Sequence, residues 1–171
     1  MDFLELIKKR YACRNFDGSE IDRNVLEEII RDASCCPSAK NTQPWRFFIS
    51  TTKEQNAKIA NALSDENKHA FLQNASAFVL IYESIPNCIA CTKYGNDRFV
   101  PYDIGQMIAY LTLSAKNRGV DSCIIGWIND DKLFNTTNIS MPCKIAVALG
   151  RAKDDVVLQK NRKNYKDLII N

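Results

Sequence analysis

Apolar residues recur at helical spacing in several stretches of the chain. In one of them, Asp22 stands where it can cap a helix whose residues Val25, Leu26, Ile29 and Ala33 share one face. The charged residues between them would lie on the opposite face. The same spacing predicts four further helices, over residues 2–10, 52–64, 69–73 and 102–118. Each of these helices would pack its apolar face against another part of the chain.

Runs of apolar and β-branched residues separate these helices. They predict four strands, over residues 46–52, 77–82, 121–127 and 144–150. The second run is apolar at every position, which indicates a strand that is covered on both faces. A short apolar run at residues 167–170 predicts a further strand at the end of a polar tail, and residues 86–101 predict a loop that lies over a pocket.

The order of these elements indicates the fold class. Strands and helices do not alternate regularly, and the chain lacks a Gly-x-Gly-x-x-Gly sequence. Both facts favour an α+β fold, a mainly antiparallel sheet layered between helices, over a doubly wound fold. With 171 residues, the chain is expected to form a single domain over residues 1–171.

Composition and charge argue against several classes of protein. The net charge of +3 is small and scattered, which argues against a nucleic-acid-binding protein. No run approaches the roughly eighteen apolar residues that a membrane span needs. Seven irregularly spaced cysteines fit reduced thiols and predict a cytoplasmic protein.

Cys88 and Cys91 form a Cys-x-x-Cys pair, which could ligate a metal ion. The adjacent Cys35 and Cys36 are poor further ligands, so we predict no metal site.

The polar loop at residues 37–45 is the strongest candidate for a binding segment. It reads Pro-Ser-Ala-Lys-Asn-Thr-Gln-Pro-Trp, and Ser38, Asn41 and Gln43 offer hydroxyl and amide groups to a ligand. A loop between a helix and a strand is a common place for binding residues because both of its ends are fixed. The sequence also allows a polar turn that Trp45 anchors to the core.

Two further segments accompany this loop. Residues 10–16 read Arg-Tyr-Ala-Cys-Arg-Asn-Phe, and Gly150-Arg151-Ala152 is followed by the basic residues Lys160 and Arg162. In order and spacing, these segments together resemble the FMN-dependent nitroreductase family over nearly the whole chain. The resemblance implies a flavin site built from loops, to which the reduced nicotinamide comes as a substrate.

The resemblance also implies roles for particular residues. Arg10, Lys160 and Arg162 would bind the flavin phosphate, and Arg14 would lie beside the pyrimidine edge of the ring, where positive charge stabilises the reduced anion. The flavin would carry the chemistry, without a catalytic side chain. The residues implied to bind the cofactor are Arg10, Ala12, Arg14, Pro37, Ser38, Ala39, Asn41, Gln43, Ile124, Ile125, Gly126, Lys160 and Arg162.

Two of these positions depart from the family pattern. Ala12 replaces the usual Ser, so one hydroxyl contact to the cofactor is expected to be missing. Ile125 stands where many relatives have Glu, which leaves a backbone contact but no acidic side chain. Gly126 matches the family's glycine, which allows the backbone to approach a flat ring closely.

The resemblance implies an enzyme that takes a hydride from NADH or NADPH and reduces nitroaromatic, quinone or similar flat acceptors by a ping-pong mechanism. It also implies a homodimer with a C-terminal strand exchanged between subunits, in which residues 38–43 of one chain face the Arg10 and Arg162 region of the other. Two alternatives stay open: a flavin-binding or flavin-sequestering protein without turnover, and a flavin reductase or dehalogenase. The lone His69 has no nucleophile near it in sequence, which argues against a hydrolase.

Overall fold

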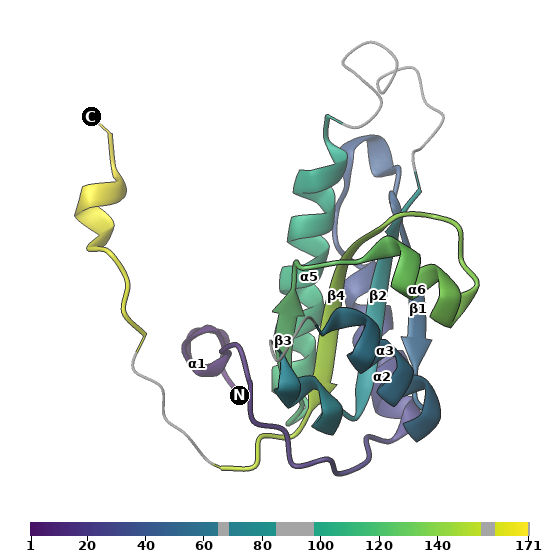
Figure 1. Ribbon diagram of the computed structural model, residues 1–171. Coiled ribbons are helices and arrows are strands. Elements are labelled where there is room, and N and C mark those ends of the chain that lie inside the picture. Colours follow the sequence, from purple (N-terminus) through teal and green to yellow (C-terminus); the bar gives the residue numbers. More distant parts are fainter. Residues whose placement is uncertain (65–68, 85–97, 155–159, 171) are drawn as a thin grey trace.

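The computed structural model describes residues 1–64, 69–84, 98–154 and 160–170 (Figure 1). Its α-helices are α1 (Phe3–Lys9), α2 (Arg23–Ser34), α3 (Lys53–Leu63), α5 (Val100–Asn117) and α6 (Asp130–Thr137). Its strands are β1 (Trp45–Ser50), β2 (Ala77–Glu83), β3 (Asp121–Ile125) and β4 (Cys143–Gly150). Three short 3-10 helices complete the described elements: η1 (Ala39–Asn41), η2 (Ala70–Asn74) and η3 (Tyr165–Leu168).

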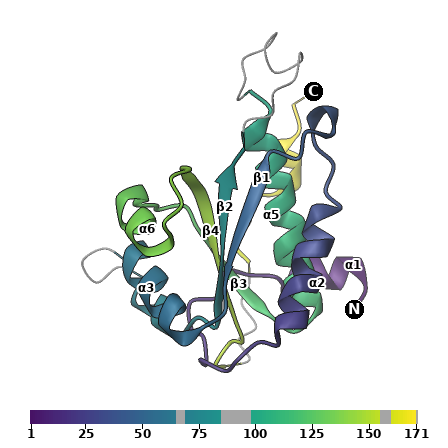
Figure 2. The ribbon, with the colours of Figure 1, turned by 90° about the vertical axis from the view of Figure 1, so that its right-hand side faces the viewer.

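The four strands form one antiparallel sheet in the order β1-β2-β4-β3. Helices α3 and α6 lie on one side of this sheet, and α2 and α5 lie on the other (Figure 2). The predicted α+β class, with an antiparallel sheet between helices, is therefore confirmed. The four predicted strands, the helix capped by Asp22 and the helices over residues 2–10, 52–64 and 102–118 are confirmed, and the one over 69–73 is the 3-10 helix η2.

Strand β2 shows why its sequence is apolar at every position. Phe78 and Leu80 belong to the core on the side of α3 and α6. Val79 and Ile81 alternate with them and belong to the core on the side of α2 and α5. All four side chains are buried. Because successive strand residues point to opposite faces, a strand with helices on both sides has no face left for polar residues.

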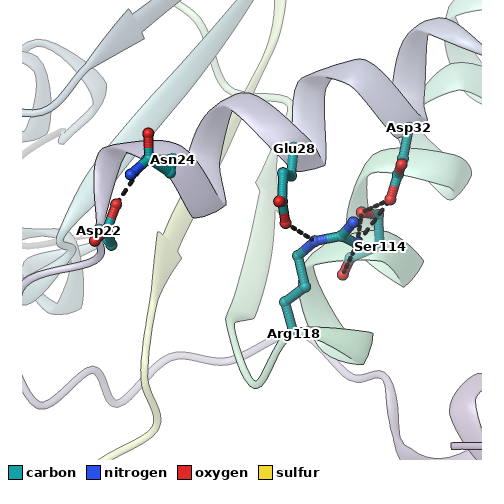
Figure 3. A network of polar contacts seen from close by, with 6 residues as sticks. All are labelled: Asp22, Asn24, Glu28, Asp32, Ser114 and Arg118. Atoms are coloured by element: carbon teal, nitrogen blue, oxygen red, sulfur yellow. Dashed lines mark hydrogen bonds and ion pairs between the residues drawn. The ribbon is translucent and has the colours of Figure 1, made fainter.

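A polar network joins α2 to the C-terminal end of α5 (Figure 3). Arg118 follows α5, and its Nε lies 3.1 Å from Glu28 Oε2, while one of its terminal nitrogens lies 2.7 Å from Asp32 Oδ2. Ser114 Oγ donates to the same Asp32 oxygen over 2.7 Å. These contacts hold the two helices in register, since each carboxylate accepts from a group on or next to the other helix.

Two expectations about secondary structure were wrong or incomplete. Within the single chain, the strand predicted at residues 167–170 does not form: residues 165–168 form η3, and Ile169 and Ile170 are exposed. The exchange of this segment between subunits stays a prediction. Helix α6 was not predicted from the sequence.

Most of the loop predicted at residues 86–101 lies outside the described residues, and α5 begins at Val100. No helix in the described ranges is long and apolar enough to cross a membrane.

Candidate functional site

The segment that carries Arg10 and Arg14 is held by pairing with strand β3 and with the chain after β4. Ala12 forms a parallel bridge with Ser122, and the Cys13 N–H donates to the Ser122 carbonyl over 2.9 Å. Farther along, Phe16 forms an antiparallel bridge with Ala152. Arg14 therefore lies between two backbone contacts with the sheet region, and Arg10 lies just before the first of them.

Phe16 explains the glycine at the end of β4. Its side chain is 2% exposed, and a Cβ at Gly150 would lie only 2.6 Å from Phe16 Cδ1. Any larger residue at position 150 would therefore push the aromatic ring away. Two of the recognised motifs, one near each end of the chain, thus support each other by packing.

An ion pair fixes the C-terminal end of α5 to the same region. Lys116 Nζ lies 2.6 Å from Asp121 Oδ1, and both side chains are largely buried. The other Asp121 oxygen accepts the Ala152 N–H over 3.2 Å. Lys116 Nζ also lies 5.5 Å from the centre of the Tyr11 ring, in the range of a cation–π contact. The ion pair therefore contacts the segment before Ala12 and the segment after β4.

The three predicted phosphate ligands come together beside α1. Burial is the main reason why the pKa of Lys160 lies below its usual value, and the charges of Arg10 and Arg162 lower it further. The Lys160 ammonium donates to the Ile7 carbonyl over 2.6 Å. We call Arg10, Lys160 and Arg162 the cation group. Among the described residues, no carboxylate forms an ion pair with any of its members.

Arg14 lies beside strand β3, where it interacts with Cys123. The pKa of the Cys123 thiol is raised chiefly by burial, and the charge and hydrogen bond of Arg14 oppose this rise. Ile124 is 41% exposed, whereas Ile125 is buried in the core and can offer a ligand only its backbone. A Cβ at Gly126 would have no protein atom within 4 Å, so the surface above this glycine is open.

Several polar groups of the loop at residues 37–45 form hydrogen bonds within the loop. The Gln43 N–H donates to Ser38 Oγ over 2.9 Å, and the Gln43 side-chain amide lies 3.2 Å from Asn41 Oδ1. The Ala39 N–H donates to both carboxylate oxygens of Asp103, over 3.2 and 3.1 Å. Pro37 is exposed at the start of the loop. The loop is therefore a well-bonded turn that also exposes the polar side chains of Asn41 and Gln43. Its role in binding a ligand stays a prediction.

Asp103 was not among the predicted site residues. It is 5% exposed and lies in the first turn of α5, 64 positions from Ala39. The sequence contains a weak signal for it, an acid in the first turn of a helix that carries Pro at its start. Nothing local indicates that this acid reaches a distant loop.

The predicted site residues form two groups, at opposite ends of α5. The loop contacts Asp103 near the start of the helix, while Tyr11, next to Arg10, contacts Lys116 near its end. These two positions are separated by roughly 20 Å of helix at about 1.5 Å per residue. Helix α1 and the C-terminal segment lie together on one side of the molecule (Figure 1). One chain therefore does not bring its own loop to its own cation group.

Large apolar side chains are exposed on α1 and on the C-terminal segment. They are 58–68% exposed at five positions and 98% exposed at Ile170. The five are Phe3, Leu4, Tyr165, Leu168 and Ile169. Large exposed apolar side chains on neighbouring residues are typical of segments that contact another molecule.

Cys88 and Cys91, the pair weighed as possible metal ligands, lie outside the described residues. The described cysteines, Cys13, Cys35, Cys36, Cys123 and Cys143, are free thiols. Within the described parts of the chain, no group of three or more His, Cys, Asp or Glu side chains could hold a metal ion. The prediction of no metal site stays a prediction for the Cys-x-x-Cys segment.

Comparison with known proteins identifies the family. The sequence matches the family model described as "Nitroreductase family" over residues 7–151. It is 33% identical to an oxygen-insensitive NADPH nitroreductase of Helicobacter pylori strain J99, in an alignment that covers 96% of this chain and 94% of that protein. It is also 41% identical over 68 residues to a protein named as an NAD(P)H nitroreductase of Streptococcus pyogenes. That match covers 40% of this chain and only 33% of the other protein.

A solved structure confirms the fold. A protein of Exiguobacterium sibiricum 255-15, described as a nitroreductase in complex with FMN, superposes with a TM-score of 0.81. The superposition covers 99% of this chain and 97% of the other, at 22% sequence identity. The family resemblance inferred from the three sequence motifs is confirmed, together with the nitroreductase-like fold.

Proposed function

The chain belongs to the nitroreductase family, and from this membership we propose that it is an FMN-dependent oxidoreductase. It would take a hydride from NADH or NADPH and reduce a nitroaromatic, a quinone or a similar flat acceptor, in a ping-pong reaction. The names of the Helicobacter and Streptococcus relatives support the nicotinamide donor, and the FMN complex of the Exiguobacterium protein supports the cofactor. The proposal places the protein in the cytoplasm, as its cysteine content suggests.

The cation group carries the proposal. Three positive charges are brought together from the two ends of the chain. Burial is the larger cause of the lowered pKa of Lys160, and repulsion by Arg10 and Arg162 adds to it. No described carboxylate offsets this repulsion, so an anionic ligand would stabilise the arrangement. A phosphate monoester suits such a group, because its oxygens accept several charge-assisted hydrogen bonds at once.

The rest of this end of the molecule fits a flat ring. When bound, FMN supplies the hydride-accepting chemistry. Exposed Ile124 and the open surface above Gly126 leave room for the ring beside β3. Arg14 stands next to that strand, where its charge would stabilise negative charge on the ring. The buried side chain of Ile125 provides no acid or base, which agrees with a role for its backbone alone.

We also propose that two copies of the chain complete each site. The loop and the cation group lie at opposite ends of α5, so a symmetric dimer could place the loop of one chain against the cation group of its partner. The exposed apolar residues of α1 and the C-terminal segment would form part of that interface. Sedimentation should find a dimer, and a stable monomer that retains FMN would contradict this part of the proposal.

Reduction of the bound flavin tests the enzymatic proposal. Protein loaded with FMN is mixed with NADH or with NADPH in the absence of oxygen. Its yellow colour should bleach at a rate no slower than turnover, and a quinone or nitroaromatic should restore it. Steady-state plots should be parallel, as a ping-pong mechanism requires. Failure to bleach with either nicotinamide would favour a flavin-sequestering protein. Bleaching without turnover of these acceptors would favour a flavin reductase or a dehalogenase.

A further inference from the structure

The loop that follows α2 has an unusual backbone. Within four residues, three that are not glycine have positive φ: Lys40 at 55°, Asn41 at 56° and Gln43 at 47°. Side chains other than glycine rarely adopt this region, although Asn tolerates it best. Such a run persists only where the surrounding structure holds it in place.

Most of the bonds that hold this loop are local. The Asn41 N–H donates to the Ser38 carbonyl over 2.9 Å, and the Gln43 N–H donates to the Ser38 hydroxyl over the same distance. These contacts shape the turn, but they do not fix it to the rest of the molecule. The hydrogen bond from the Ala39 N–H to Asp103 does so, because it reaches a buried residue of α5.

The Asp103 carboxylate is suited to this task and has no other described partner. It is buried and forms no ion pair among the described residues. Both of its oxygens accept from the same Ala39 N–H. Its position in the first turn of α5 favours a negative charge there, because the free N–H groups of a helix start attract anions. The neighbouring Cys36 is buried, and the pKa of its thiol is raised by burial first and by the Asp103 charge second.

We propose that Asp103 is the positioning residue of the binding loop. Its carboxylate holds Ala39 at the beginning of the left-handed run and thereby presents Asn41 and Gln43 in one fixed arrangement. Asp103 touches no ligand in this arrangement and acts only through the loop. That the loop's ligand is the flavin of a partner chain rests on the proposed function, but the positioning role does not.

Proteolysis of the flavin-free protein tests this role directly. Lys40 is exposed within the left-handed run, so trypsin cleavage after Lys40 reports how often the loop opens. Asp103→Ala should accelerate this cleavage by about tenfold, the effect of losing one charge-assisted hydrogen bond. Asp103→Asn keeps an oxygen acceptor of the same size and should restore most of the protection. Wild-type cleavage rates after Lys40 in both variants would overturn the proposal.

Two controls separate loop opening from general destabilisation. Cleavage after exposed Lys163, in the C-terminal segment of the same molecules, should stay unchanged. Asp32→Asn weakens the contacts between α2 and α5 without touching the loop, and it should leave the Lys40 rate near the wild-type value. Equal acceleration at Lys40 in Asp32→Asn would overturn the specific role of Asp103. If Asp103→Ala does not fold, Asp103→Asn alone tests the proposal, because its cleavage rate after Lys40 should rise by about twofold over the wild-type rate.

Titration with FMN distinguishes this inference from the proposed function. If both hold, Asp103→Ala should weaken FMN binding by about tenfold, and Asp103→Asn should recover most of it. Faster cleavage after Lys40 with no change in FMN affinity would leave the positioning role intact and remove the loop from the flavin site. Unchanged cleavage in a protein that binds FMN would remove the positioning role and leave the proposed function standing.

Discussion

The two ends of α5 carry the two groups of predicted site residues, and they are built in opposite ways. At the N-terminal end, a buried carboxylate accepts from the loop backbone, and the polar side chains of the loop hydrogen-bond within the loop. At the C-terminal end, paired backbone segments support three cations that no described carboxylate neutralises. The polar groups of the first end are largely hydrogen-bonded to one another and fix the conformation of the loop. The cations of the second end form no ion pair with a described carboxylate, so an anionic ligand would stabilise them. A site that needs both properties would draw on both ends, and two chains could supply them together.

The largest expected effect comes from removing charge at the C-terminal end. The double substitution Lys160→Ala and Arg162→Ala removes two charge-assisted contacts, each worth roughly 1.5–3 kcal/mol. FMN affinity should fall by about 100-fold or more in a fluorescence titration. Lys163→Ala with Lys166→Ala removes the same net charge from the same exposed segment, so it should change the affinity little. Equal losses in both double variants would show that general attraction, and not the cation group, binds the phosphate.

The second-largest effect is expected from breaking the buried ion pair between Lys116 and Asp121. Asp121→Ala leaves Lys116 buried without its partner and frees the Ala152 N–H. The free energy of unfolding should fall by about 3 kcal/mol, as expected when one member of a buried pair is lost. Urea unfolding measures it. Glu27→Ala breaks an exposed ion pair with Arg23 and should shift the midpoint far less. Equal shifts would show that the buried pair has no special role.

The packing of Phe16 on Gly150 should have a smaller effect. Gly150→Ala places a methyl group against the Phe16 ring and should lower the free energy of unfolding by about 1–3 kcal/mol. Combining it with Phe16→Leu should cost less than the sum of the two single changes, because the smaller side chain makes room. Gly126→Ala meets no protein atom and should leave the free energy of unfolding nearly unchanged. Additive costs in the double variant would exclude the proposed contact.

The smallest effect is expected in the core beneath the sheet, away from both ends of α5. Burial raises the pKa of the Cys143 thiol from 9.0 to about 11. Between these values the folded chain keeps a proton that the unfolded chain releases, so its contribution to stability is full below pH 9 and is lost as the pH rises. The loss is at most about 1.4 kcal/mol per pH unit.

Urea unfolding at several pH values, from below the ordinary thiol pKa of 9.0 to near the raised value of about 11, checks the Cys143 effect. Cys143→Ala should flatten the fall in stability with pH, whatever its effect on the absolute value. Cys35→Ala changes an exposed thiol and should leave the slope as in the wild type. A wild-type slope in Cys143→Ala would assign the pH dependence to other groups, such as Tyr82, whose pKa is also raised by burial.

The sequence predicted the elements whose pattern is repeated over many residues. The apolar spacing of α2 and α5 and the continuous apolar run of β2 each require burial, so they indicate both the element and its place in the core. Helix α6 was missed because only one of its residues, Leu133, is buried, and Asp, Asn and Thr dominate the rest. The C-terminal apolar run does not form a strand within the single chain, because a strand needs a neighbouring strand, and its exchange between subunits stays a prediction.

The site was predicted in part, and for a different reason. Nothing local connects Arg10 with Lys160 and Arg162, because the two segments meet only through the fold. Their common role came from the family resemblance. The contact between Asp103 and Ala39 could not be predicted, since it spans 64 positions and depends on where α5 lies against the loop. The spacing of apolar residues predicts which residues are buried. Contacts between residues far apart in the sequence depend on how the helices and strands are arranged, which this spacing does not specify.

The central claim is that the cation group binds the phosphate of FMN. The most direct measurement compares the affinities of FMN and of riboflavin, which has the same ring and no phosphate. Wild-type protein should prefer FMN by about 100-fold or more, and Lys160→Ala with Arg162→Ala should lose nearly all of that preference while binding riboflavin as before. Equal affinity of the wild type for both flavins, or an unchanged preference in the double variant, would contradict the account.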